Sequence, residues 1–469
     1  MKIGEFAQQL IELLIFKLKR LFKKNARFVA FEVARTGHLQ FVQNILAGYI
    51  KRFPGDNIYI VYDQDTASRR KVKNTLENLL PQLKNRAHYA AFYFLRKGAY
   101  AGIDLFIVPD QFSRGAADIF SVCIFHGQPS KGITFSGEII EAFDAFFLYG
   151  PLHQDALKEF IREYCAGELP AHLALYEIGY TKSDQLLRGE YNREKILLEM
   201  GLNAGEKTIL YAPAYDEGAS LRECGPELVR AITENGKDNV IVKFHYRDGP
   251  ALSDSFRFGG EVDWFGKFKE IEKEYPNFKV CTDLQIDSCL ACSDVLITDI
   301  SSASFEFLAL NKPVIFINTP KFFSGFLKQR FPDKDTISWA ERTTVNAGRE
   351  FGLVVSSISE LPGAIEEVLG HPETYPRQQS RLKEYLLYNR GKATEAALQK
   401  IDSLLKAGVK LKKPYKKKVF FLVFLSLVAL LLRRLLTAPV KTCMPGVYAK
   451  IKSCMASSAD PGKNEKQHK

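Results

Sequence analysis

The sequence lacks the cysteine pattern of a disulfide-rich or zinc-binding protein. Its 469 residues contain eight cysteines, scattered along the chain. Cys289 and Cys292 have CxxC-like spacing, but no second pair matches them, so the spacing alone does not predict a zinc site. We therefore expect reduced thiols, as in a cytosolic protein. The sequence shows no other cluster of metal ligands, and we expect the chemistry to require neither a metal nor another cofactor.

The sequence also lacks the apolar run of about 20 residues that a membrane-spanning helix needs. The best candidate, Val419–Leu432, is shorter and is followed by a pair of arginines. We interpret residues 407–438 as a basic and apolar anchor that lies in the membrane interface. The alternative is a true span that continues through Leu436, with the arginines snorkelling. Residues 439–469 form a polar, basic tail that we expect to be loosely ordered.

No cleavage site of small residues follows the N-terminal stretch, so this stretch does not resemble a signal peptide. At helical spacing, residues 1–26 place an apolar face opposite a polar, basic face, which is typical of a helix lying on a bilayer. A helix packed on the protein's own core would show the same pattern. The apolar face consists of Ile3, Leu10, Leu14, Leu18, Leu21 and Phe22.

The middle of the chain has no net positive charge. The net charge is +11, but residues 1–27 carry +5 and residues 407–469 carry +12, which leaves −6 for the remainder. A nucleic-acid-binding protein should carry its basic excess on the folded domain. Here the excess lies at both ends, beside apolar residues, which indicates an anionic membrane surface as partner and excludes nucleic acid.

Length and composition predict a multidomain α/β protein, because this chain is too long for one core. Short apolar runs, typical of buried parallel strands, alternate with helical segments. We expect an N-terminal parallel-sheet domain at 27–185 and a C-terminal one at 186–406. Residues 381–406 predict one long helix. The predicted strands are 28–33, 58–62, 89–95, 105–108, a run ending at His126, 145–149, 177–180, 208–212, 239–244, 278–282, 295–298 and 351–356.

The stretch Asp294–Asn318 predicts a strand, a hydroxyl-rich turn, a helix and a second strand. Asp299, Ser301 and Ser302 occupy the turn, where free backbone N–H groups at a helix start favour an anion. The alternative is that the serines only cap their own helix.

Two histidines lie at predicted strand ends, one in each half. His126 precedes Gly127, and His245 follows the strand 239–244. Ligands of open α/β folds bind at the carboxyl ends of strands, so the cleft between the halves is the expected site. Asp63–Asp65 mimics the metal-binding DxD motif of some glycosyltransferases, but aspartates at a strand end are ordinary turn residues.

Five motifs in this order resemble those of the CDP-glycerol glycerophosphotransferases, which make teichoic-acid and capsule polymers. Each motif alone carries little information, but together they span roughly residues 120–320. The similar segments are Phe125–Lys131 (HGTPLK in the family), Ile178–Asp184 (GxPRxD), Ile209–Tyr215 (ILYAPTW), Lys243–His245 (KxHP) and Leu296–Ser302 (LITDYSS).

This resemblance implies a GT-B-like fold, with two Rossmann-like domains, here 27–185 and 186–406, facing a cleft and the nucleotide mostly on the second. It also implies that the last helix, 381–406, crosses back onto the first domain. The sequence departs from the family pattern at Gln128, Ser130, Thr181, Tyr246 and Ile300. It retains both histidines and the Asp-x-Ser-Ser turn, so we expect the chemistry to be intact.

The resemblance also implies roles for individual residues. A hydroxyl needs a base to act as nucleophile, and imidazole suits that task, so His126 is the expected general base on the acceptor side. His245 is expected to contact the donor diphosphate. We expect the remaining donor contacts to be Lys243, Asp299, Ser301, Ser302 and Pro213, and the acceptor loop to include Gly127 and Lys131.

The predicted reaction moves a polyol phosphate, glycerol phosphate first of all, from a CDP-activated donor to a hydroxyl of a lipid-linked or polymeric acceptor, with release of CMP. We expect it at the cytoplasmic face of the membrane, in cell-wall or capsule biosynthesis. Two alternatives remain open. A GT-B glycosyltransferase that uses a nucleotide sugar would share the cleft, and an inactive membrane-associated scaffold would share the fold.

Overall fold

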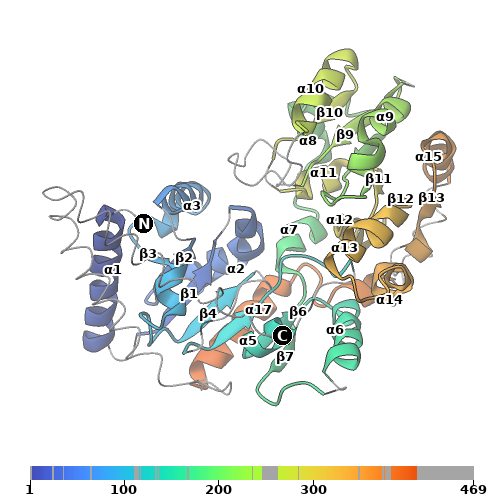
Figure 1. Cartoon of the computed structure of the whole chain (residues 1–469). Helices are drawn as coiled ribbons and strands as arrows, with labels where there is room; N and C mark the ends of the chain where they lie inside the picture. Colours follow the sequence, from blue (N-terminus) through green and yellow to red (C-terminus); the bar gives the residue numbers. More distant parts are fainter. Residues whose placement is uncertain are drawn as a thin grey trace, which may run out of the picture.

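The computed structural model describes residues 3–408, apart from 24–25, 35, 64–65, 110–115, 117, 132–134, 136, 166–167, 235, 246–261, 284, 347–348, 372–373 and 375–381. Two lobes, each built on one parallel sheet, lie next to each other (Figure 1). The predicted anchor and tail at 407–469 fall almost wholly outside the described residues. No helix within the described part of the chain is long and apolar enough to cross a membrane.

The first sheet has seven strands, all paired in parallel. Its central strands are fully buried, which explains why they appear in the sequence as continuous apolar runs. In spatial order the strands are β3 (Ala87–Ala91), β2 (Asn57–Tyr62), β1 (Phe28–Glu32), β4 (Leu105–Val108), β5 (Ser121–Cys123), β6 (Ala145–Leu148) and β7 (Ala174–Glu177).

The second sheet has six parallel strands, and the direction of strand order reverses between β8 and β11. The carboxyl ends of these two strands form the topological switch point where α/β sheets bind ligands. In spatial order the strands are β10 (Phe278–Val280), β9 (Asn239–Val242), β8 (Thr208–Tyr211), β11 (Val295–Thr298), β12 (Val314–Ile317) and β13 (Leu353–Val355).

Helices connect the strands and cover the sheets. Short 3₁₀ helices lie at Thr36–His38 (η1), Pro81–Leu83 (η2), Thr181–Ser183 (η3), Ser338–Glu341 (η6), Arg349–Phe351 (η7) and Ile358–Glu360 (η8), and a π-helix at Phe322–Leu327 (η5). The α-helices are α1 (Ile3–Phe22), α2 (Leu39–Arg52), α3 (Thr66–Leu79), α4 (Phe92–Arg96), α5 (Gly137–Ala142), α6 (Pro151–Tyr164), α7 (Asp184–Leu187), α8 (Arg193–Glu199), α9 (Ser220–Thr233), α10 (Trp264–Glu274), α11 (Asp287–Cys292), α12 (Ala303–Ala309), α13 (Lys328–Arg330), α14 (Thr343–Asn346), α15 (Leu361–Gly370) and α17 (Ala393–Lys406).

Three local predictions were wrong. The strand predicted at 177–180 lies three residues earlier, at Ala174–Glu177. The run predicted as a strand at 89–95 ends as strand at Ala91 and continues as α4. The long helix predicted at 381–406 is interrupted, because Asn389 and Gly391 adopt left-handed backbone conformations with φ of 44° and 73°. Helix α17 starts only after this break. It packs on α2 of the first lobe, where Arg27 pairs with Asp402 at 3.0 Å.

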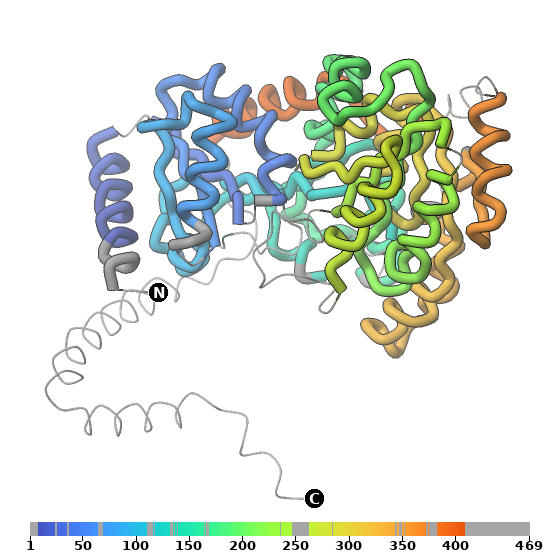
Figure 2. Tube along the Cα trace, turned by 90° about the horizontal axis from the view of Figure 1, so that it is seen from above, coloured from blue at the N-terminus to red at the C-terminus, as the bar shows by residue number. Residues whose placement is uncertain are grey.

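Helix α1 lies at the end of the first lobe that is far from the second lobe (Figures 1 and 2). One face packs on the sheet, where Phe16 is fully buried with its ring 5.4 Å from Tyr59 and 5.1 Å from Tyr100. Leu10 also packs against this core, so part of the predicted membrane face is used internally. A second apolar row remains exposed and consists of Ile11, Leu14, Leu18, Leu21 and Phe22.

Candidate functional site

A cavity of about 100 Å³ lies between the two lobes. Its walls come from the strand ends of both sheets, as expected for the default ligand site of such a fold. Most of the predicted site residues are brought together here, namely His126, Pro213, Lys243, His245, Ser301 and Ser302.

The backbone conformation at Phe125 directs the side chain of His126 toward this cavity. Its side chain is fully buried against Phe146 and His153, and its backbone adopts φ of 57°, which is uncommon for a bulky residue. Burial of the Phe125 ring therefore determines the direction in which the next side chain leaves the strand. The His126 ring stacks on His38, with ring centroids 5.6 Å apart.

The Ser301–Ser302 turn faces the histidine loop of the other lobe. A Cβ atom placed on Gly127 would lie 3.5 Å from Oγ of Ser302. Ser302 occupies the N-cap position of α12 without a side-chain capping bond, whereas Oγ of Ser301 accepts a hydrogen bond from the backbone N–H of Ala303 at 3.4 Å. Capping therefore engages only Ser301, and weakly.

The structure does not bring Asp299 to the cavity. The carboxylate is buried and accepts hydrogen bonds from the backbone N–H of Ala214 and Ser220, both at 2.9 Å. It also accepts from Oγ of Ser220 at 2.6 Å and from the N–H of Ile300 at 2.7 Å. Asp299 therefore holds the loops after β8 and β11 in register beneath the cavity.

Lys131 also lies outside the cavity lining, and its side chain contacts residues of the second lobe. Its ammonium pairs with Asp216 and lies 4.6 Å from the centroid of the Tyr215 ring. Burial alone would lower the pKa of Lys131, but Asp216 and Tyr215 raise it above its ordinary value. Lys131 is therefore a permanent cation at neutral pH.

His245 and Lys243 follow β9 at the edge of the cavity. The His245 ring lies against Tyr215, with ring centroids 4.4 Å apart and an interplanar angle of 34°. The Lys243 ammonium lines the cavity and donates a hydrogen bond to the carbonyl of Phe244 at 2.9 Å. One protein hydrogen bond leaves two of its three donors for a ligand or for water.

Lys182, Asp287 and Glu306 form a buried ionic cluster at the cavity, which the sequence did not predict. The ammonium of Lys182 donates to Asp287 at 2.8 Å and to Glu306 at 2.6 Å. Burial would lower the pKa of Lys182, but the two carboxylates raise it. Burial raises the pKa of Glu306, although Lys182 opposes the shift. The sequence feature that points to Lys182 is the second motif, Ile178–Asp184, in which Lys182 takes the place of the family's arginine.

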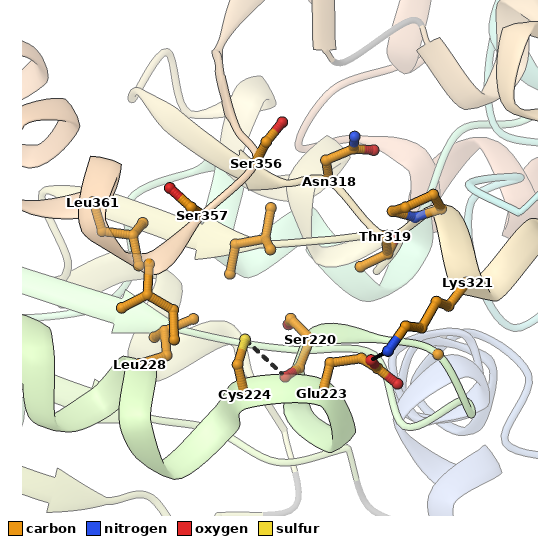
Figure 3. A pocket seen from close by; sticks show the side chains of 14 residues that line it. Ser220, Glu223, Cys224, Leu228, Asn318, Thr319, Lys321, Ser356, Ser357 and Leu361 are labelled. Atoms are coloured by element: carbon orange, nitrogen blue, oxygen red, sulfur yellow. Dashed lines mark hydrogen bonds and ion pairs between the residues drawn. The ribbon is translucent and has the colours of Figure 1, made fainter.

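A larger cavity of about 250 Å³ lies in the second lobe alone, between α9 and the ends of β12 and β13 (Figure 3). Its charged residues, Lys321 and Glu223, pair with each other. Cys224 donates to the carbonyl of Ser220 at 3.5 Å, and burial raises the pKa of its thiol to about 11, so it is a poor nucleophile. This cavity has no histidine in its lining, and the interlobe cavity is the better candidate site.

Metal ligands do not gather anywhere among the described residues: no group of three or more His, Cys, Asp or Glu side chains could hold an ion there. Of the DxD-like motif, Asp63 follows β2, while Asp65 lies outside the described part of the chain.

Comparison with known proteins agrees with the motifs. Residues 158–322 match the family model described as CDP-glycerol:poly(glycerophosphate) glycerophosphotransferase. The matched region contains His245 and the Ser301–Ser302 turn, and the His126 loop precedes it. The teichoic acid poly(glycerol phosphate) polymerase of Bacillus spizizenii is 26% identical over 149 residues, which cover 30% of this chain and 34% of that protein. The aligned part thus spans about a third of the length of this curated relative.

Solved structures share the fold at low identity. The wall teichoic acid polymerase TagF has a TM-score of 0.55 and 16% identity, with 87% of this chain and 100% of that chain covered. A proposed UDP-N-acetylglucosamine 2-epimerase from Listeria monocytogenes has a TM-score of 0.51 and 14% identity, with 83% and 99% covered. The predicted family resemblance and the GT-B-like fold are both confirmed.

Proposed function

We propose that this chain, which is similar to the CDP-glycerol:poly(glycerophosphate) glycerophosphotransferases, transfers glycerol phosphate from CDP-glycerol to an acceptor hydroxyl and releases CMP. The observation that carries the proposal is the meeting of His126 from the first lobe with His245 and the two serines from the second at one cavity. The donor is also supported by a histidine-to-asparagine variant of TagF that was soaked with CDPG.

The proposed step forms one P–O bond and breaks another. His126 accepts the proton of the acceptor hydroxyl, and the oxygen attacks the phosphorus that carries glycerol. The bond between this phosphorus and the bridging oxygen breaks, and the electron pair leaves with CMP. His245, Lys243, Ser301 and Ser302 contact the diphosphate and stabilise the negative charge that spreads over it.

We propose that lysine, histidine and hydroxyl groups suffice for this charge stabilisation, without a divalent metal. The cationic side chain of Lys243 lines the cavity and has donors to spare. Transfer should therefore persist in excess EDTA at 50% or more of its initial rate. Loss of activity in EDTA that returns with Mg²⁺ or Mn²⁺ would contradict this part of the proposal.

The composition of the two ends of the chain supports a place of action at a membrane surface. We propose a peripheral enzyme at the cytoplasmic face of an anionic membrane, acting on a lipid-linked or polymeric acceptor in cell-wall or capsule polymer synthesis. The exposed apolar row of α1 and the basic residues of both termini support this placement.

A donor panel tests the proposed function. The purified full-length chain is incubated with a membrane-fraction acceptor and CDP-glycerol, CDP-ribitol or UDP-sugars, and nucleotide release is measured. We expect CMP release from CDP-glycerol above all. UDP release from a UDP-sugar would identify the glycosyltransferase alternative, and no release from any donor would favour the inactive scaffold.

A further inference from the structure

Tyr215 joins a residue of the first lobe to His245 in the second lobe. Its ring centroid lies 4.4 Å from that of His245 and 4.6 Å from the ammonium of Lys131. Both Tyr215 and His245 belong to the second lobe, whereas Lys131 comes from the loop that carries His126. The contact with Lys131 is therefore a contact between the lobes.

Lys131 and Asp216 form an ion pair beside Tyr215. Asp216, beside Tyr215 in sequence, is only 6% exposed and pairs with Lys131. Since the pKa of Lys131 is raised, the ammonium stays protonated at neutral pH. A cation near an aromatic face is attracted to the ring, and a partly desolvated one is attracted more strongly. Lys131 thus holds Tyr215 both through its ring and through the neighbouring carboxylate.

An imidazole at a strand end needs support for its ring plane, because rotation about its last side-chain torsion is broad. The Tyr215 ring lies along one side of His245 and limits that rotation. Two further contacts bring the same lobes together next to this point: Oγ of Ser130 donates to the carbonyl of Ile300 at 2.8 Å, and Gly127 faces Ser302. The orientation of His245 is therefore linked to the apposition of the two lobes.

We propose that Tyr215 is a positioning residue for His245, and that Lys131 makes this positioning depend on contact between the lobes. His245 presents its nitrogen to the donor diphosphate when the His126 loop is docked, so both histidines are in place in the same state. The expected effect on kcat rests on the proposed function. The claim that Tyr215 orients His245 does not depend on it.

Two variants of Lys131 test whether the effect of Lys131 reaches His245, because Tyr215 contacts both residues. In the full-length protein labelled with ¹³C-histidine, the ring resonance of His245 is identified among eight histidines by its loss in His245→Gln. We expect Lys131→Met to shift this resonance and to lower kcat for CMP release about 10-fold, with a smaller change in the donor KM. Lys131→Arg should recover most of both effects. Lys158→Met, which removes an exposed lysine–aspartate pair on α6, is the matched control and should change neither.

A folded Lys131→Met protein with an unmoved His245 resonance would overturn the proposal, whatever its activity. If Lys131→Met does not fold, Tyr215→Leu and Tyr215→Phe decide. We expect about a 10-fold loss of kcat in Tyr215→Leu and recovery of most of it in Tyr215→Phe, because the phenylalanine ring can still lie against His245. Equal kcat in Tyr215→Leu and the unmodified protein would overturn the proposal. If the unmodified protein releases no CMP from CDP-glycerol, the proposed function fails, and the resonance of a folded variant still tests the positioning of His245.

Discussion

At the scale of single residues, the cavity is organised by buried charges that sequence patterns identify only in part. Asp299 was predicted to contact the donor, but it serves four hydrogen-bond donors of its own loops. Lys182 was visible only as one residue of a motif, yet it pairs with two carboxylates, one from α11 and one from α12. Which carboxylates meet which lysine depends on packing across the lobes, and no local pattern encodes it.

Removal of Lys182 should be more damaging than removal of its partner. Lys182→Met leaves Asp287 and Glu306 buried without their counter-ion, and we expect the free energy of unfolding to fall by about 3–5 kcal/mol. Glu306→Gln keeps the shape and mimics the protonated carboxyl that burial favours, so we expect a loss of about 1–2 kcal/mol.

Denaturant unfolding at pH 7 measures both changes. Lys195→Met is a suitable control, since it removes an exposed pair on α8 and should cost less than about 1 kcal/mol. Equal stability of Lys182→Met and the unmodified protein would contradict a structural role for the cluster.

At the scale of secondary-structure elements, the sequence predicts strands well because buried parallel strands are apolar throughout. The predicted run 295–298 coincides with β11, and 105–108 coincides with β4. Predictions failed where tertiary contacts override local preference. Residues 92–95 are apolar and aromatic, as a strand would be, but form α4, and the break before α17 is stabilised by Asp184, which accepts hydrogen bonds from the N–H groups of Ala393 and Thr394.

Substitutions in the turn between β11 and α12 should weaken donor binding more than acceptor binding. Because Ser302 is not engaged in capping, Ser302→Ala should raise the KM for CDP-glycerol about 10-fold through loss of a hydrogen bond to a charged group. Ser301→Ala should have a smaller effect on the donor KM. Initial rates at varied donor and varied acceptor concentrations separate the two substrates. A larger rise in the acceptor KM than in the donor KM would contradict the assignment.

Helix α1 should divide into a stabilising face and a membrane-binding face. Leu14→Ser combined with Leu21→Ser and Phe22→Ser removes exposed apolar side chains, and we expect weaker flotation with anionic vesicles at an unchanged melting temperature. Phe16→Ala should instead lower the free energy of unfolding by about 3–5 kcal/mol, because that ring is fully buried. Vesicle binding that survives the triple substitution would locate the membrane contact elsewhere.

At the scale of the whole molecule, the two lobes share an apolar core cluster and also meet through polar contacts around a small cavity. The cavity holds about 100 Å³, whereas pockets for drug-sized ligands measure about 300–1,000 Å³. We therefore expect the lobes to open to admit a CDP-polyol and to close again on the bound donor, so that the His126 loop is docked during transfer. The arrangement of the two lobes could be predicted only through the family resemblance, since no pattern in the chain specifies how two sheets face each other.

The mass of the acceptor after reaction with CDP-glycerol tests the central claim most directly. With the unmodified protein, we predict one added glycerol phosphate unit for each CMP released. His126→Ala should lower this rate by at least about 100-fold, the usual contribution of a general base, while CDP-glycerol still binds. His245→Ala should reduce both turnover and donor binding. Full transfer by both variants, or a product that gains a sugar in place of glycerol phosphate, would contradict the account.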